Sequence, residues 1–384
     1  MRIDSRTVIT GALLSGAILI YIVSLVSWRQ GALFLVGIGA GLILYHAAFG
    51  FTSAWRDMIS KGRGAGLRAQ MIMLAVTAII FLPLLADGQL WGMELRGSVR
   101  PLSVSVIVGA FLFGVGMQLG GGCASGTLFT AGGGNMRMVI TLVAFIVGSA
   151  LGAYHLPAWQ AAPGFGPVSL LDQFGFGSAL VISLVLFASV WLGSAFVERR
   201  RHGALEKNAT CFAAGSWLRG PWPLVVGAIG LAGVNIATLT LAGRPWGVTS
   251  GFALWGSKAG AALGFDVVAW PYWQGPTASA ALEASVFSDI TSVMNFGIIL
   301  GALMAAGFAG RFAPIWRVPW GSLLAAIAGG LLLGYGARIA YGCNIGAYFS
   351  GISSSSLHGW LWFVAALVGN GLGAKLRPAF RLSN

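Results

Sequence analysis

The sequence predicts an all-α membrane protein, a polytopic helical bundle with an inverted internal repeat and short re-entrant helices. Of its 384 residues, 57% are hydrophobic and only 9% are charged, whereas a soluble globular domain carries roughly 25% charged residues. Several apolar runs approach or exceed the ~20 residues that a helix needs to cross a bilayer. Two distant glycine-rich stretches also repeat one another, which predicts a chain built from two related halves.

Ten apolar segments are predicted to be membrane elements of a single transmembrane domain, residues 1–384. In chain order they run over 9–27, 31–49, 69–86, 104–119, 137–154, 176–196, 222–242, 288–308, 320–338 and 357–374. Arg2 and Arg6 precede the first segment, and no small-residue cleavage site follows it. We therefore interpret the first segment as a retained span rather than a signal peptide.

The net charge of +13 reflects membrane topology rather than nucleic-acid binding. Lys and Arg gather in short loops, and no basic stretch is interleaved with aromatic residues that could stack on bases. The most basic loop, 198–219, is expected on the cytoplasmic side, because cytoplasmic loops carry the excess of Lys and Arg. The basic residues at 56–68 and 375–381 are expected beside it, with both termini cytoplasmic.

The internal repeat centres on two Gly-Cys motifs. Residues 114–130 contain Gly-x-Gly, then Gly-Cys-x-x-Gly, then Phe-Thr, and residues 334–350 repeat this pattern with Phe-Ser at an offset of 220 residues. The match continues from 147–153 to 368–374 at an offset of 221. A fainter match of four residues pairs Gly50–Ser53 with Gly247–Ser250.

These matches define repeat halves of about 31–154 and 222–374, joined by a connecting span at 176–196. Each half holds four membrane elements and the connector adds one, so the second half is expected to enter the membrane from the opposite face. The glycine-broken stretches 114–134 and 334–356 are the candidates for re-entrant helices. Paired interruptions in inverted halves indicate a transport site near the membrane midplane, where converging backbone N–H groups favour an anion.

Cys123 and Cys343 occupy the same position in the two matched motifs and are the main candidate site residues. A neutral thiol is a weak donor with a polarizable sulfur, which suits a soft sulfur-containing anion, and no adjacent His or Lys would activate it as a nucleophile. Cys211 lies outside the repeat and is interpreted as an incidental loop residue. No Cys-x-x-Cys or paired His motif is present, so no metal or cofactor is predicted.

Polar residues near the two motifs could line the same pathway. Asn344 follows Cys343, and Gln118 lies shortly before Cys123. Arg338 and Lys258 fall in apolar stretches, where a charge is costly and usually marks a pathway or extends to the membrane surface.

The stretches 114–126 and 336–351, with Leu357–Trp360 after them, resemble the signature segments of the YeeE/YedE family of bacterial inner-membrane sulfur-compound transporters. The resemblance implies multi-pass insertion in the inner membrane and uptake of thiosulfate or a related anion. It also implies an hourglass pathway in which cysteines pass the anion by S–H hydrogen bonds, and a cytoplasmic TusA-like sulfur-carrier protein as partner. Cys123 and Cys343 carry over directly.

Residues 49–57 also resemble thiosulfate-transporting members, but Gly50 stands where that resemblance implies a third cysteine. Either that cysteine is dispensable or this chain moves another sulfur or selenium species. The expected pathway residues are Cys123, Cys343, Gly122, Gly126, Gly342, Gly346, Asn344 and Gly50. The alternatives are an enzymatic thiol relay that forms a cysteine persulfide and a membrane scaffold. Serine substitution separates transport from the relay, because serine keeps a hydrogen-bond donor but cannot form a persulfide.

Overall fold

A computed structural model of the chain describes residues 3–206, 212, 216–314 and 316–382. Cys211 lies outside the described residues. Within them, ten helices are long and apolar enough to cross a membrane, and each overlaps one predicted span. Their main helices are α1 (Ser5–Leu25), α2 (Trp28–His46), α4 (Ala65–Asp87), α5 (Val104–Gly120), α7 (Met136–Gln160), α8 (Leu170–His202), α10 (Leu224–Ala242), α13 (Ile290–Ala309), α14 (Trp320–Ile339) and α16 (Leu357–Leu376). Four of the spans continue into the short helices that follow α2, α5, α14 and α16. The chain is therefore a polytopic helical membrane protein, as predicted.

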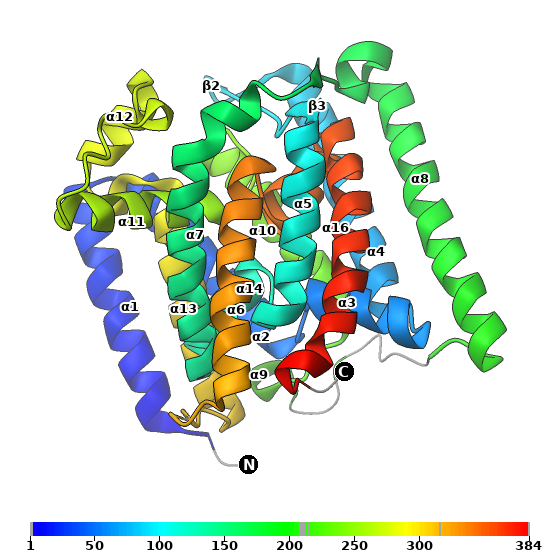
Figure 1. The fold of residues 1–384 in the computed structure, drawn as a ribbon, viewed down its shortest axis with the longest axis horizontal. Coiled ribbons are helices and arrows are strands. Elements are labelled where there is room, and N and C mark those ends of the chain that lie inside the picture. Colours follow the sequence, from blue (N-terminus) through cyan, green and yellow to red (C-terminus); the bar gives the residue numbers. More distant parts are fainter. Residues whose placement is uncertain (1–2, 207–211, 213–215, 315, 383–384) are drawn as a thin grey trace.

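Shorter elements connect or interrupt these spans. The helical ones are α3 (Phe51–Arg56), η1 (Asp57–Lys61), α6 (Ala124–Gly132), α9 (Ser216–Arg219), α11 (Thr249–Ala262), η2 (Pro271–Trp273), α12 (Pro276–Glu283), η3 (Val286–Ser288), η4 (Asn344–Phe349), α15 (Ser350–Ser353) and η5 (Arg377–Phe380). Two antiparallel strand pairs, β1 (Gln89–Leu90) with β2 (Met93–Glu94) and β3 (Pro101–Ser103) with β4 (Gly164–Pro167), lie at one end of the bundle (Figure 1). Both chain termini lie at the opposite end, which we call the terminal face.

The helix ends follow ordinary capping chemistry. Ser27, Ser103, Asn135 and Ser169 precede α2, α5, α7 and α8, and each side chain accepts a hydrogen bond from an amide in the first turn of its helix. Helices α4, α10 and α13 each end at a glycine in the left-handed conformation. These caps fix where the helices begin and end beside the apolar runs.

Close glycine contacts hold α5 against α16 and α14 against α7. A Cβ atom at Gly114 would meet the carbonyl oxygen of Ala366, and a Cβ atom at Gly334 would meet that of Phe145. Gly114 and Gly334 differ by the repeat offset of 220, and Phe145 and Ala366 by the offset of 221. The two helix pairs thus pack through equivalent residues.

Helices α5 and α14 cross each other in opposite directions. A Cβ atom at Gly109 would lie 2.7 Å from the carbonyl oxygen of Gly336, and one at Gly116 would lie 2.9 Å from that of Gly329. The start of α5 therefore contacts the end of α14, and a later part of α5 contacts an earlier part of α14. Equivalent helices running in opposite directions are the arrangement expected of an inverted repeat. We propose that the halves 31–154 and 222–374 are so related, and that α3, α6 and the η4–α15 segment are re-entrant.

We expect Gly114→Ala to destabilise the protein by about 1–3 kcal/mol, because the added methyl group would press on the backbone of α16. Gly193→Ala is the matched control, since a Cβ atom at Gly193 in α8 meets nothing within 4 Å. Thermal unfolding of both variants in detergent measures the difference. Equal melting temperatures for the two would contradict the close packing of α5 on α16.

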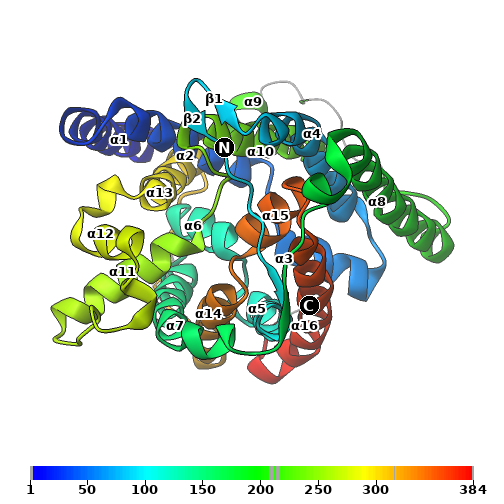
Figure 2. The ribbon, with the colours of Figure 1, turned by 90° about the horizontal axis from the view of Figure 1, so that it is seen from above.

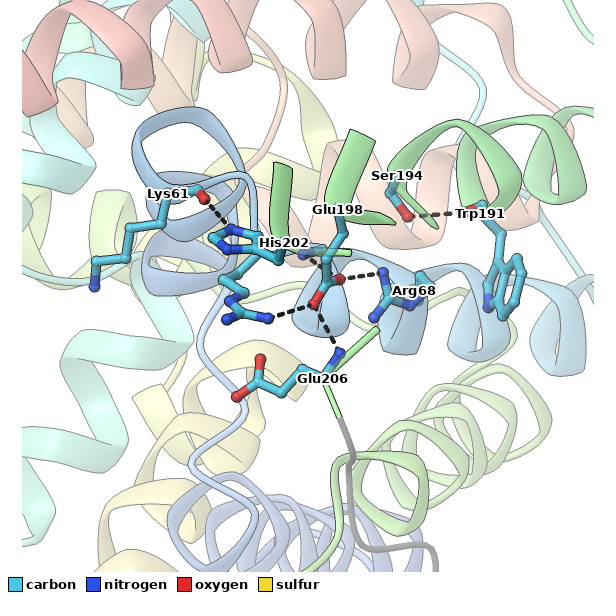
Figure 3. Close-up of polar contacts among 9 residues, drawn as sticks. Lys61, Arg68, Trp191, Ser194, Glu198, His202 and Glu206 are labelled. Atoms are coloured by element: carbon cyan, nitrogen blue, oxygen red, sulfur yellow. Dashed lines mark hydrogen bonds and ion pairs between the residues drawn. The ribbon is translucent and has the colours of Figure 1, made fainter. Parts of the chain in front are cut away.

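Helix α8 stands at the edge of the bundle and packs on α4 (Figures 1 and 2). Near its end, the fully buried carboxylate of Glu198 lies 2.7 Å from Arg68 and 3.3 Å from Arg63. The same carboxylate accepts hydrogen bonds from the backbone N–H groups of Gly64 and Glu206 at 3.1 and 2.9 Å (Figure 3). This cluster fixes the connector to the start of α4, and it was not predicted from the sequence.

Candidate functional site

The first Gly-Cys motif forms a sharp turn between α5 and α6. Gly121 takes a positive φ of 89°, which glycine adopts without strain, and ends α5. Cys123 then caps α6: its sulfur lies 3.4 Å from the amide nitrogen of Gly126 and 3.4 Å from the hydroxyl of Ser125. The thiol is thus held at the N-terminus of a helix, where backbone dipoles favour negative charge.

The second motif forms the equivalent turn between α14 and η4. Cys343 precedes η4, and its sulfur accepts a hydrogen bond from the amide of Ile345 at 3.4 Å. At Gly342 the backbone passes close to the next turn, since a Cβ atom there would lie 2.7 Å from the nitrogen of Ala347. A larger residue at this position would displace the turn that holds the cysteine.

The two turns meet inside the bundle. Helix α6 contacts η4, and α6 and α15 lie near the middle of the bundle when it is viewed along the helices (Figure 2). Both cysteines are buried, with 2% of Cys123 and none of Cys343 exposed, and neither forms a disulfide. The structure therefore brings together two motifs that are separated by 220 residues in the sequence.

A cavity of about 170 Å³ leads to Cys123. It lies between α3 and the first motif, so that Gly50, Gly122, Cys123 and Gly126 line one space; the other lining residues are Ala48, Phe51, Thr52, Ser53, Arg56, Gly121, Phe129 and Thr130. The predicted site residues of the first half are thus grouped together. Gly342, Asn344 and Gly346 lie instead in the Cys343 turn, outside this lining.

Buried polar atoms without a partner mark the same region. Thr52 lines the cavity and is only 6% exposed, yet its hydroxyl has no hydrogen-bond partner among the described residues. Both polar atoms of the fully buried Asn344 amide are likewise unpaired there. Leaving such groups unpaired costs about 1–3 kcal/mol each, which a bound polar ligand or water would remove.

Two equivalent side chains hold the backbone beside the two turns. The Gln118 amide donates to the carbonyl oxygen of Thr52 at 3.2 Å, and the Arg338 guanidinium donates to that of Thr249 at 3.0 Å. Gln118 and Arg338 are related by the offset of 220, and Thr52 and Thr249 fall in the fainter repeat match. Gln118 and Arg338 therefore hold the short helices α3 and α11.

Other residues from the sequence analysis have different surroundings. Lys258 donates to the carbonyl oxygens of Leu282 and Ala284 at 2.5 and 2.7 Å, outside the cavity lining. Within the described ranges, no group of three His, Cys, Asp or Glu side chains could hold a metal ion. Thr52 and Arg56 line the cavity but were not predicted as site residues; the fainter match at Gly50–Ser53 was the signal for Thr52.

The fold is that of a polytopic membrane protein, and the family and relatives that the chain matches are transporters. A family model described as sulphur transport matches residues 46–372. The chain belongs to this sulphur-transport (YeeE/YedE) family.

Curated relatives match either most of the chain or about half of it. The thiosulfate transporter TsuA of Spirochaeta thermophila is 30% identical over 354 residues, which is 88% of this chain and 95% of that protein. TsuA of Escherichia coli is 24% identical over 348 residues, 86% of this chain and 89% of that protein. The probable transporter YedE of Escherichia coli is 32% identical over 171 residues, 44% of this chain and 41% of that protein.

Proposed function

We propose that this protein takes up thiosulfate or a related small sulfur-containing anion through a central pathway that passes Cys123 and Cys343. The observation that carries the proposal is the meeting of the two Gly-Cys turns inside the bundle, one of them at the end of a cavity. The names of the TsuA relatives support thiosulfate as the substrate.

The thiols are suited to pass an anion without a covalent step. Both sulfurs accept hydrogen bonds from backbone N–H groups, so each S–H hydrogen can donate to a ligand; at Cys123 the hydroxyl of Ser125, 3.4 Å from the sulfur, is the competing partner. In the cavity, the unpaired hydroxyl of Thr52 and the guanidinium of Arg56 supply stronger donors. Several weak stations in series let the anion enter and leave again, which conduction requires.

The orientation follows from the charge distribution. We assign the terminal face to the cytoplasm of a bacterial inner membrane, because it carries the basic end of α8 and both termini. A cytoplasmic sulfur-carrier protein of the TusA type would receive the anion at this face. The pathway residues that we assign are Cys123, Cys343, Gly122, Gly126, Gly342, Gly346, Asn344 and Gly50.

Uptake of labelled thiosulfate tests the proposal in cells that lack their own sulfate and thiosulfate importers. Cells that express this chain should accumulate label, and unlabelled thiosulfate should compete better than sulfate. A chain that reaches the membrane but gives no uptake contradicts the assignment. Repeating the assay with sulfite, sulfide and selenium species then identifies the substrate. Another substrate is a specific alternative because Gly50 stands where thiosulfate-transporting members are expected to have a third cysteine.

Gly50→Cys is expected to fold normally and to add a thiol to the cavity. The backbone of Gly50 is extended with φ of −102°, and the nearest obstacle to a Cβ atom is the movable hydroxyl of Ser53. In a Cys123→Ala/Cys211→Ala/Cys343→Ala background, the introduced thiol is the only cysteine of the chain. A membrane-impermeant maleimide applied to the terminal face should then label the Gly50→Cys variant, and thiosulfate should slow the labelling. Labelling only from the opposite face would show that the cavity opens there and would contradict access from the terminal face.

A further inference from the structure

A second cavity, of about 410 Å³, opens beside the Cys123 cavity and lies between the start of α7 and the loop that joins α13 to α14. We call it the arginine basin, after Arg137, Arg311 and Arg317 in its wall; its other lining residues are Tyr45, Phe129, Thr130, Gly133, Gly134, Asn135, Met136, Ala313, Val318, Pro319 and Ser322. Phe129 and Thr130 line both cavities, so only these two side chains of α6 belong to both walls.

The basin lies at the terminal face. The amide of Asp4, near the N-terminus, donates to the carbonyl oxygen of Gly307 near the end of α13 at 2.9 Å. Gly321, at the start of α14, lies against Phe380 near the C-terminus. The loop between α13 and α14 is therefore beside both ends of the chain, at the lower edge of Figure 1.

The charge in the basin is uncompensated within the described part of the chain. None of its lining residues is acidic, and neither Arg311 nor Arg317 forms an ion pair with a described carboxylate. The Arg137 guanidinium donates hydrogen bonds to the carbonyl oxygens of Gly120 and Leu119, at 2.9 and 2.5 Å, and these acceptors carry no charge. Three guanidinium groups that share one cavity without a carboxylate repel one another and favour an anion.

The geometry also suits an anion of a particular kind. The first turn of α7 borders the basin through Met136 and Arg137, and helix N-termini add N–H groups and positive potential. Guanidinium forks match the paired oxygens of tetrahedral oxyanions. The volume is more than twice that of the Cys123 cavity, so an anion could enter it with part of its hydration shell.

We propose that the arginine basin binds a small, doubly charged tetrahedral oxyanion and, given the proposed function, is the station through which the transported anion passes on the terminal face. Phe129 and Thr130 separate it from the Cys123 cavity, and the basin concentrates the anion next to the surrounding water. Arg311 and Arg317 are its binding residues, because Arg137 is already committed to the end of α5.

Equilibrium binding of labelled thiosulfate to the purified full chain in lipid-free detergent tests this site. The Cys123→Ala/Cys343→Ala background weakens the central stations, so that the basin is the main remaining site. Binding should persist in this background and become about ten-fold weaker when Arg311→Gln and Arg317→Gln are added, since charged hydrogen bonds are lost. Arg199→Gln with Arg200→Gln removes equal charge from exposed positions at the end of α8 and should leave binding unchanged.

Uptake by the wild type and the effect of an anionic lipid on the melting temperature separate failure of the basin proposal from failure of the proposed function. If wild type transports thiosulfate but the Arg311→Gln/Arg317→Gln change leaves binding intact, the basin proposal fails while the proposed function stands. If wild type shows no uptake, the proposed function itself fails. Phosphatidylglycerol in mixed micelles should raise the melting temperature of wild type and the double arginine variant equally. Loss of that lipid effect in the variant, with thiosulfate binding unchanged, would make the basin a lipid-headgroup site and overturn the proposal.

Discussion

Replacing Cys343 with alanine is expected to lower thiosulfate uptake by about ten-fold to a hundred-fold, and the same change at Cys123 should have an effect of similar size. Each thiol is buried at the tip of its turn, and alanine removes the S–H donor. A buried anion that loses one donor forfeits roughly 1–3 kcal/mol, which corresponds to this range of rates. Initial uptake rates, normalised to the amount of protein in the membrane, measure the effect.

The serine variants at the same positions are the matched controls. Serine keeps a donor of similar size and is a favoured helix N-cap, so Cys123→Ser should preserve the turn before α6. We expect serine variants to transport faster than alanine variants. If alanine and serine abolish uptake equally, and a persulfide is found on the wild-type cysteine, the hydrogen-bonding account is wrong and a covalent relay is correct.

Glu198→Ala is expected to destabilise the protein by about 3–5 kcal/mol. The substitution leaves Arg68, whose side chain is only 8% exposed, without its carboxylate, and an unpaired buried charge is costly. The amides of Gly64 and Glu206 also lose their acceptor. Thermal unfolding in detergent, with the change placed in a cycle with Arg68→Ala, measures the coupling between the two residues.

The exposed ion pair between Glu94 and Arg96 is the control for this prediction. The charged atoms of this pair are 2.8 Å apart, close to the 2.7 Å between Arg68 and Glu198, but the Arg96 and Glu94 side chains are 75% and 62% exposed. Glu94→Ala should leave the melting temperature unchanged, because water and salt screen such pairs. A Glu198→Ala variant as stable as Glu94→Ala would show that α8 is not held through this cluster.

The ten spans could be predicted because long apolar runs report directly on the bilayer. The boundaries were less accurate at one end of α8. Gly175, with φ of 72° and ψ of 173°, breaks the helix, so its long part begins at Phe176 as predicted, but it ends at His202 rather than at 196 because basic turns continue it past the apolar run. The approach of Cys123 and Cys343 was foreseeable only because the motifs repeat. Equivalent elements in two related halves tend to meet around a common axis.

Contacts between unrelated parts of the chain were not predictable. Arg56 reaches the Cys123 cavity from a helix of six residues, too short to leave a periodic pattern. Arg63 and Arg68 were interpreted only as signals of membrane topology, yet they pair with Glu198, 130 residues or more away. Which loop charges become buried ion pairs depends on the tertiary structure, and these pairs could not be predicted from a single sequence.

Transport by the purified chain in proteoliposomes tests the central claim most directly. Vesicles loaded with unlabelled thiosulfate exchange it for external labelled thiosulfate, so the assay needs no assumed driving force. The account predicts rapid accumulation of label with wild-type protein, and exchange at least ten-fold slower with Cys123→Ala/Cys343→Ala protein of equal thermal stability. No exchange by folded wild-type protein, or equal exchange by both, would contradict a pathway through the two cysteine turns.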